Sequence, residues 1–339
     1  MNQMQASQVS NSQTEILLAK DLRKSYGQRQ ALQGLSFSLK TGHVLGFLGP
    51  NGAGKTTSIR ILTTMMEPEL GHFVVDGTSS EHPEEIRRKI GVLPENLGFP
   101  RQMTGIEYLT YFGQLYGRTA AEAREHGWKL IEDVGLKQRA RSLIGSYSHG
   151  MRQRIGIARA LVNDPVVVFL DEPTLGLDPR GQQELLSLIQ RIARERNAGV
   201  VLCSHALSEI ESVCDDVVIL NRGQVVAQGS VSEVIGRVQQ SILLGSALRV
   251  QVPAVSFAKA RIILKAIPAI TKVSPIGEME GWLRMEPVES VNGDASKAYQ
   301  INNTILSDLI RNEIPILSFE VEGGRLHDVF LHLTEETIQ

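Results

Sequence analysis

The chain has 339 residues, of which 42% are apolar and 21% are charged, and its formal net charge is −2. This length exceeds what one hydrophobic core usually supports, so about two domains are expected. The near-neutral charge gives no electrostatic attraction toward DNA or RNA, and no nucleic-acid partner is expected. The two cysteines, Cys203 and Cys214, suit neither a disulfide framework nor a zinc site and favour a reducing, cytosolic setting.

The first 14 residues are polar and are predicted to form a disordered tail. They lack the basic start and the apolar stretch of a secretory signal. No apolar run in the chain approaches the ~20 residues that a membrane-spanning helix needs. Any association with a membrane is therefore expected to depend on a partner.

Residues 15–238 alternate short apolar runs, glycine turns and helical stretches, a pattern typical of an α/β layered domain. Residues 44–48 are expected to be a buried strand and 56–66 the helix after it. Helical periodicity between residues 96 and 163 predicts a mostly helical subdomain. Further strands are expected at 90–93, 166–170, 199–204 and 216–220, and the helices of the subdomain at 106–116, 120–134 and 150–162.

Residues 239–339 have a different pattern, which predicts a separate α+β domain. Its elements are expected in the order strand, helix, strand, strand, helix, strand, which is the βαββαβ order of a ferredoxin-like unit. A short amphipathic segment at 326–333 follows. The six elements are expected at 248–252, 257–267, 269–276, 282–288, 295–312 and 316–321.

A glycine-rich loop follows the first buried strand and matches the phosphate-loop pattern G-x-x-x-x-G-K-[ST]. Successive backbone N–H groups of such a loop curl around the β- and γ-phosphates, and Lys55 adds a positive charge at the same oxygens. The Thr56 hydroxyl is a ligand for Mg²⁺. A strand before the loop and a helix after it make a chance glycine turn a poor alternative. The loop consists of Gly49, Pro50, Asn51, Gly52, Ala53, Gly54, Lys55, Thr56 and Thr57.

Two carboxylates follow the apolar run at 166–170. Asp171 is placed to hold the metal ion, as the aspartate of a Walker-B strand does. Glu172 points elsewhere and is a candidate general base for the attacking water. The alternative is that both residues simply cap a strand end. The phosphate loop in the same chain argues against it.

In this order, the motifs GPNGAGKTT, YSHGMRQR, VVVFLDEPTLGLD and the later Ser204-His205 resemble the ATP-binding cassette (ABC) ATPases of transporters. The resemblance covers residues 16–236 and implies a P-loop α/β fold that hydrolyses ATP with Mg²⁺. It also implies a head-to-tail dimer with a second ATPase subunit. In that dimer, Ser148 and Gly150 of one subunit contact the γ-phosphate held by the loop of the other.

Three further positions match the family residue by residue. Tyr26 corresponds to the aromatic that stacks on adenine, although a tyrosine in a strand is common. His205 corresponds to the switch histidine at the γ-phosphate, where a structural histidine is the alternative. Asp178 lies in the loop that crosses the dimer interface, or is an ordinary turn aspartate.

The chain departs from the family at three positions. Glu95 stands where a glutamine usually meets Mg²⁺ and the attacking water, and a carboxylate there remains a candidate metal ligand. His149 and Met151 replace the commoner glycine and glutamine of the family's signature segment, which is residues 147–153 in this chain. Because Ser148 and Gly150 are kept, hydrolysis is still expected.

Two stretches, MTGIEYL at 103–109 and LHDVFLHLT at 326–334, resemble the drug- and polysaccharide-export branch of the family, which works with ABC-2-type permeases. The resemblance implies an exporter subunit attached to the cytoplasmic face of the membrane through a separate integral membrane permease. A sugar-type importer ATPase is the second interpretation, but its C-terminal domain is an all-β barrel. A non-transport ABC protein is the third, and it usually carries two cassettes or a long coiled coil.

Overall fold

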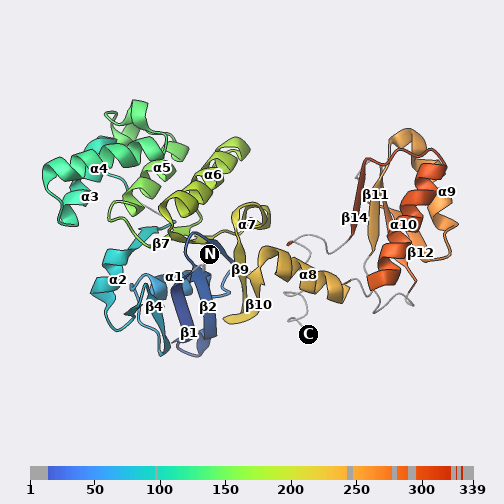
Figure 1. The fold of residues 1–339 in the computed structure, drawn as a ribbon, viewed down its shortest axis with the longest axis horizontal. Coiled ribbons are helices and arrows are strands. Elements are labelled where there is room, and N and C mark those ends of the chain that lie inside the picture. Colours follow the sequence, from blue (N-terminus) through green and yellow to red (C-terminus); the bar gives the residue numbers. More distant parts are fainter. Residues whose placement is uncertain are drawn as a thin grey trace, which may run out of the picture. The chain divides into compact units, whose positions relative to one another are not determined.

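The computed structural model describes residues 14–95, 98–242, 247–276, 281–288 and 295–321, together with Leu326 and Phe330. The chain divides into two units, Met1–Gly229 and Ser230–Gln339 (Figure 1). Of the expected polar tail, residues 1–13 lie outside the described residues. Most of the expected amphipathic segment at 326–333 also lies outside them.

A largely parallel sheet runs through the first unit in the strand order β10-β9-β3-β8-β7-β6. Strand β3 pairs in parallel with β8 and β9, and β7 pairs in parallel with β6 and β8. Every residue of β3 and β8 is buried, as expected for parallel strands covered on both faces. The carboxyl ends of β3, β7 and β8 therefore meet at one edge of the sheet. The strands are β3 (Val44–Leu48), β6 (Ile90–Leu93), β7 (Val167–Asp171), β8 (Gly199–Cys203), β9 (Asp216–Asn221) and β10 (Gln224–Ser230).

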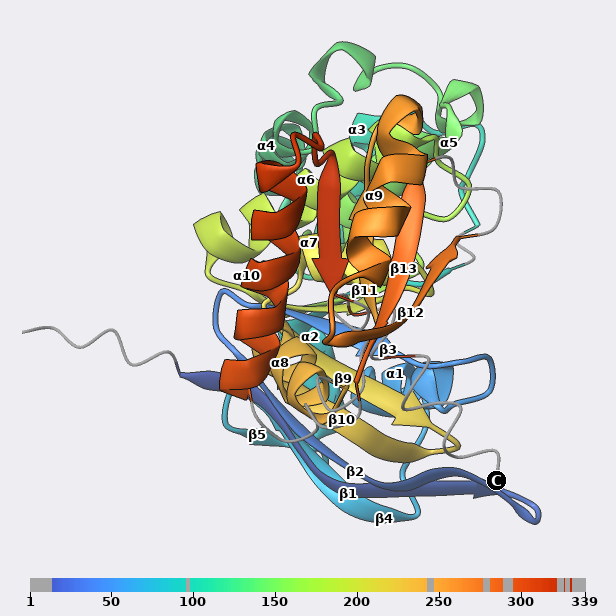
Figure 2. The same ribbon diagram turned by 90° about the vertical axis from the view of Figure 1, so that its right-hand side faces the viewer.

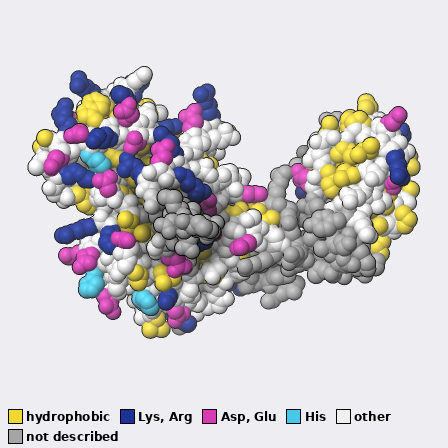
Figure 3. Space-filling model, viewed as in Figure 1, with side chains coloured by type: hydrophobic (Ala, Val, Ile, Leu, Met, Phe, Trp, Pro, Cys, Tyr) yellow, Lys and Arg dark blue, Asp and Glu magenta, His cyan; other side chains and the backbone are white. Residues whose placement is uncertain are grey.

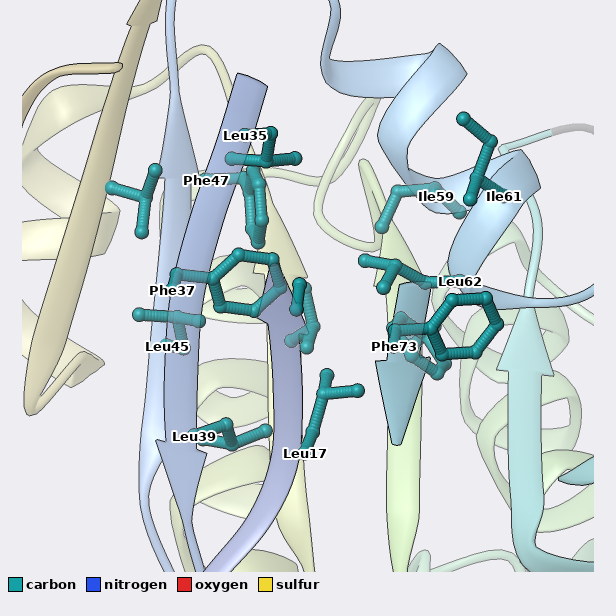
Figure 4. Packing of buried hydrophobic residues seen from close by; sticks show 14 of the residues in the cluster. Leu17, Leu35, Phe37, Leu39, Leu45, Phe47, Ile59, Ile61, Leu62 and Phe73 are labelled. Atoms are coloured by element: carbon teal, nitrogen blue, oxygen red, sulfur yellow. The ribbon is translucent and has the colours of Figure 1, made fainter. Parts of the chain in front are cut away.

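A second, antiparallel sheet in the order β2-β1-β4-β5 packs on the first across a shared apolar core. Phe37 of β2 and Phe47 of β3 meet edge to face with ring centroids 5.1 Å apart, and Leu17 and Phe73 pack in the same cluster (Figure 4). Such aromatic contacts fix the two sheets at one spacing. The strands are β1 (Glu15–Tyr26), β2 (Arg29–Lys40), β4 (Leu70–Val75) and β5 (Thr78–Ser79).

The helical subdomain lies between β6 and β7 in the sequence, where helical periodicity predicted it. Two of its helices begin with reciprocal capping boxes, in which Thr104 pairs with Glu107 and Thr119 pairs with Glu122. The helices of the first unit are α1 (Lys55–Leu62), α2 (Pro83–Lys89), α3 (Gly105–Leu115), α4 (Ala120–Asp133), α5 (His149–Ala160), α6 (Pro179–Arg196) and α7 (Leu207–Val213), with short 3-10 turns at Lys137–Arg139 and Ile144–Ser146.

Helix α1 ends at Leu62, whereas the sequence predicted a helix as far as residue 66. Thr64 adopts a left-handed conformation with φ 60°, and its N–H donates to the carbonyl of Ile61 at 2.9 Å. The N–H of Met65 donates to the carbonyl of Arg60 at 2.8 Å. This pair of bonds is a Schellman termination, which satisfies the last carbonyl groups locally. The prediction was wrong here because the apolar Met65 and Met66 continue the helical pattern beyond the turn.

The second unit begins with α8 (Val231–Ile242), which crosses the boundary that the sequence pattern placed after residue 238. Its sheet has the antiparallel order β12-β13-β11-β14, the strand order of a ferredoxin-like unit. Helices α9 and α10 lie on one face of this sheet and share its apolar core (Figure 2). The remaining elements are β11 (Leu248–Gln251), a 3-10 turn (Ala254–Ser256), α9 (Phe257–Lys265), β12 (Ile270–Pro275), β13 (Trp282–Pro287), α10 (Ala295–Arg311) and β14 (Ser318–Val321).

Candidate functional site

The phosphate loop leaves β3 and enters α1, with Gly54 as the N-cap of the helix at φ 113°. A Cβ atom on Gly54 would lie 2.6 Å from the carbonyl oxygen of Ala31, and one on Gly49 would lie 2.4 Å from that of Leu220. Glycine is therefore required at both positions, for its backbone angle at Gly54 and for space at both. Lys55 Nζ folds back onto the loop and donates to the carbonyl groups of Gly49 and Pro50. The first N–H groups of α1 and this ammonium make the loop a site for anions.

A cavity of about 630 Å³ opens over the loop and contains most of the predicted site. Tyr26 lies at its margin with its side chain exposed, and its hydroxyl donates to Met66 Sδ at 3.2 Å. Glu95, Asp171, Glu172 and His205 line the cavity although they come from three different segments, each at the carboxyl end of a strand. The lining residues are Tyr26, Arg29, Ala31, Asn51, Gly52, Gly54, Lys55, Thr56, Thr57, Glu95, Asp171, Glu172, Leu175 and His205.

Arg29 is a lining residue that the sequence analysis missed. Its guanidinium donates to the carbonyl of Gly52 at 3.1 Å and so adds positive charge beside the phosphate loop. A phosphate-rich ligand in the cavity would meet both this guanidinium and the Lys55 ammonium. The signal in the sequence was weak, because a basic residue just after Tyr26 has no motif of its own.

Glu172 and His205 form a hydrogen-bonded pair, with 2.8 Å between Glu172 Oε2 and His205 Nδ1. Glu172 has a left-handed backbone with φ 49°, while its N–H donates to the carbonyl of Cys203 at 2.9 Å. This conformation turns the chain sharply at the end of β7, and backbone strain of this kind is concentrated at functional sites. The pair combines a carboxylate with a group able to orient it, which is the geometry of a general base.

Asp171 lies partly buried in the cavity beside Glu172 and Glu95. Burial raises the pKa of Asp171 above its ordinary value of 3.8, and the negative charges of Glu172 and Glu95 raise it further. Lys55 and Arg60 act in the opposite direction. Within the described parts of the chain, His, Cys, Asp and Glu side chains do not gather in a group of three or more that would hold a metal by itself. A cation at Asp171 would therefore need the Thr56 hydroxyl and ligand oxygens, a donor set that suits Mg²⁺.

The predicted residues Ser148, Gly150 and Asp178 do not line this cavity. Ser148 is the exposed N-cap of α5, and its hydroxyl accepts from the N–H of Met151 at 3.3 Å. Asp178 is the N-cap residue of α6, directly before Pro179. Within one chain these residues therefore lie outside the cavity over the phosphate loop.

A second cavity of about 630 Å³ lies beside the amino end of α5 and shares Glu95 with the first. Its walls bring the segment after β6 together with the signature segment. Glu95 is thus a wall common to both cavities, which the sequence did not indicate. The second cavity is lined by Glu95, Gly98, Phe99, Arg101, Ile144, Gly145, His149, Arg152 and Gln153.

Comparison with known proteins gives a consistent group of relatives. A family profile described as ABC transporter matches residues 32–175. The chain is 31% identical over 327 residues to the linearmycin resistance ATP-binding protein LnrL of Bacillus subtilis, which covers 96% of this chain and 100% of that protein. It is 32% identical over 324 residues to the daunorubicin/doxorubicin resistance ATP-binding protein DrrA of Streptomyces peucetius, covering 95% and 93%. A solved ATP-binding subunit of an ABC transporter superposes with a TM-score of 0.58 at 31% identity, over 66% of this chain and 92% of that chain.

We predict that Asp171→Asn raises the free energy of unfolding of the nucleotide-free protein at neutral pH. A carboxyl group whose folded-state pKa is raised holds its proton more tightly in the folded state, so its ionisation destabilises the fold as pH rises through that pKa. The advantage of the asparagine should therefore be absent near pH 3 and grow toward pH 7. Denaturant titrations across this range measure it, with the exposed Glu81→Gln as control. An advantage that is equal at both ends of the range would contradict the assigned cause.

Proposed function

This chain belongs to the family of ABC transporter ATP-binding proteins, and we propose that it powers export through a separate membrane permease. As a member of that family it is the ATPase subunit of a transporter. The ATPase part of the proposal depends on one observation. The phosphate loop, Asp171 and the hydrogen-bonded Glu172–His205 pair share one cavity. Phosphoryl transfer to water depends mainly on positioning and on charge stabilisation, and this cavity provides groups for both.

The nucleotide is proposed to bind along the cavity from Tyr26 to the phosphate loop. The exposed ring of Tyr26 offers a flat face to adenine. The N–H groups of the loop and Lys55 hold the β- and γ-phosphates, and Arg29 adds charge beside Gly52. When ATP binds, we expect Lys55 Nζ to leave the carbonyl groups of Gly49 and Pro50 for phosphate oxygens.

Magnesium is the metal that we propose for this site. The Thr56 hydroxyl and the Asp171 carboxylate would hold it together with phosphate oxygens, with Glu95 as a further candidate ligand. Burial and the nearby charges of Glu172 and Glu95 raise the pKa of Asp171. This supports the assignment, because a divalent cation would stabilise the ionised carboxylate. When bound, the ion neutralises charge on the β- and γ-phosphate oxygens.

Glu172 is proposed as the general base. Its carboxylate lies in the cavity and accepts the proton of the attacking water, while His205 holds it in place through the 2.8 Å hydrogen bond. The bond uses Nδ1 of the imidazole, and a ring that carries both protons can also donate from Nε2 to the γ-phosphate. His205 would thereby connect the base to the phosphate that is cleaved.

The active site is proposed to be completed by a second copy of the chain. Ser148 and Gly150 lie at the start of α5, whose free N–H groups suit a phosphate. Since neither residue lines the cavity of its own chain, they are available to the nucleotide of a partner. A head-to-tail dimer places them there, and Asp178 beside them at the interface. ATP binding would close this dimer, and hydrolysis would reopen it.

Export is favoured over import by the relatives and by the second unit. Two near-full-length relatives, LnrL and DrrA, carry names of resistance proteins, and their alignments extend through the second unit. That unit contains α9 and α10 on its sheet, whereas an importer of the sugar type would have an all-β barrel. A role on nucleic acid has little electrostatic support, because acidic and basic side chains are interspersed on the face of the first unit shown in Figure 3.

The permease is proposed to dock on the helical subdomain at the cytoplasmic face of the membrane. Tyr108 and Leu109 of α3 are buried, but Tyr111, Leu115 and Tyr116 are exposed at its end. Exposed apolar side chains grouped on one helix are typical of a contact surface. Through the parts of the chain that the structure describes, no helix combines the length and apolarity required to traverse a bilayer. The permease selects the cargo, because it lines the pathway.

We predict that Glu95→Gln changes the Mg²⁺ dependence of ATP hydrolysis. If Glu95 holds the ion or its water, an amide in place of the carboxylate weakens the electrostatic attraction, and half-maximal activity should need several-fold more Mg²⁺. Titration of ATPase activity with Mg²⁺ measures this effect, with Glu67→Gln as an exposed control. Unchanged turnover and unchanged Mg²⁺ dependence would remove Glu95 from the metal site.

The transporter assignment is tested by isolating the native complex. We expect the full-length chain, tagged at one end and expressed from its own locus, to be recovered from detergent-solubilised membranes together with an integral membrane protein. A variant with Tyr111, Leu115 and Tyr116 changed to serine should bind ATP normally and lose that partner. Recovery only in the soluble fraction, with ribosomes or DNA, would contradict the proposal.

A further inference from the structure

His149, which replaces the usual glycine of the signature segment, makes a contact that a glycine could not make. Its Nε2 lies 2.8 Å from the carbonyl oxygen of Leu175, and a hydrogen bond at this distance requires the ring to donate from Nε2. Leu175 belongs to the loop of residues 173–178, which runs from the catalytic Glu172 to Asp178 at the start of α6. The contact therefore joins the amino end of α5 to this loop within one chain.

The same loop is anchored at its other side by a buried carboxylate. Glu209 Oε2 accepts hydrogen bonds from Thr174 Oγ1 and from Ser204 Oγ, both at 2.7 Å. All three residues are at most 7% exposed, so water does not compete for these bonds. Thr174 is thus linked through Glu209 to the segment that carries His205, and Leu175 is linked through His149 to α5.

The middle of the 173–178 loop has few internal constraints. Gly176 has φ 77°, and the N–H groups of Leu175 and Leu177 make single backbone bonds of 3.2 and 3.1 Å to Glu172 and Thr174. The ring of His149 contacts this turn at the Leu175 carbonyl group, and Gly176 also lies close to the ring. An exposed imidazole held at a carbonyl group restricts where the rest of the loop can lie.

We propose that His149 is a positioning residue that holds the 173–178 loop against the amino end of α5. It thereby keeps Ser148, Gly150 and Asp178 as one preformed surface for the nucleotide of the partner subunit. The functional part of this inference rests on the proposed head-to-tail dimer. Surfaces that are ordered before association lose less conformational entropy when they bind, so this contact favours dimer closure rather than the chemical step.

The structural part is tested by amide hydrogen exchange of the full-length, nucleotide-free chain. His149→Ala removes the donor, and exchange at the amides of Leu175 and Leu177 should become about three- to tenfold faster, the range that one neutral hydrogen bond supports. His149→Gln keeps an N–H donor and should exchange close to the wild-type rate. Met151→Gln changes the other unusual signature residue and should have no effect at these amides.

Two results of the exchange experiment would overturn the proposal. One is unchanged exchange at Leu175 and Leu177 in His149→Ala. The other is exchange in His149→Gln that is as fast as in His149→Ala, since the donor would then not be what holds the loop. Equal unfolding midpoints among the variants show that a change in exchange is local. None of these results depends on catalysis, so they stand whether or not the dimer forms.

The functional part is tested by ATPase activity measured against protein and ATP concentration. In His149→Ala, the concentrations for half-maximal activity should rise about three- to tenfold while kcat at saturation stays within about twofold of wild type. A fall in kcat alone would place His149 in the chemical step and overturn the positioning role. If the proposed dimer is wrong, wild-type activity will show no dependence on protein concentration, which separates that failure from failure of His149.

Discussion

Parallel pairing of β3, β8 and β7 is the constraint on which the site depends. It places the phosphate loop, the Asp171–Glu172 pair and the Ser204–His205 segment at one edge of a buried sheet. The N–H of Glu172 still donates to Cys203 of β8 although its backbone has already turned to φ 49°. This combination directs the Glu172 carboxylate to His205 rather than along the strand. The 2.8 Å bond between them is a direct consequence of strand alignment.

Charged side chains are concentrated at this edge, and the basic ones offset the acidic ones only in part. Burial raises the pKa of Asp171, and the negative charges of Glu172 and Glu95 raise it further. Lys55 and Arg60 compensate only in part. A cation relieves the repulsion among the carboxylates, and a polyanion pairs with the Lys55 ammonium. The cavity therefore favours ligands that bring both. ATP with Mg²⁺ has that composition.

In the proposed head-to-tail dimer, the loop of residues 173–178 would link the surfaces that contact two different nucleotides. Its start is fixed through Glu209 to the segment with His205, and its middle contacts His149 at the signature helix. In a head-to-tail dimer, a shift of Glu172 at the nucleotide of its own chain would therefore displace the surface that this chain presents to the nucleotide of its partner. The His149 contact gives this chain a connection that the common glycine lacks.

The sequence predicted the site well where chemistry is written in short motifs. Asp171, Glu172, His205 and Glu95 line one cavity with most of the phosphate loop. Each lies at the end of a strand, or within two residues of it, and the burial of these strands was evident from their apolar residues. Arg29 and the Glu209 network were missed, since their partners are distant in sequence and no local pattern records them. The end of α1 was misplaced because the left-handed Thr64 carries no glycine signal.

The central claim, that each active site is shared between two chains, is tested most directly by mixing two inactive variants. Lys55→Ala removes the phosphate-loop cation, and Gly150→Asp sets a negative charge at the signature segment, where a side chain meets only Leu177 at 3.5 Å. A mixed dimer holds one site with both defects and one intact site. We expect mixing to restore about a quarter of wild-type turnover, because about half of the dimers are mixed and each mixed dimer has one working site out of two. If the mixture stays as inactive as its components, each site lies within a single chain and the shared-site dimer is wrong.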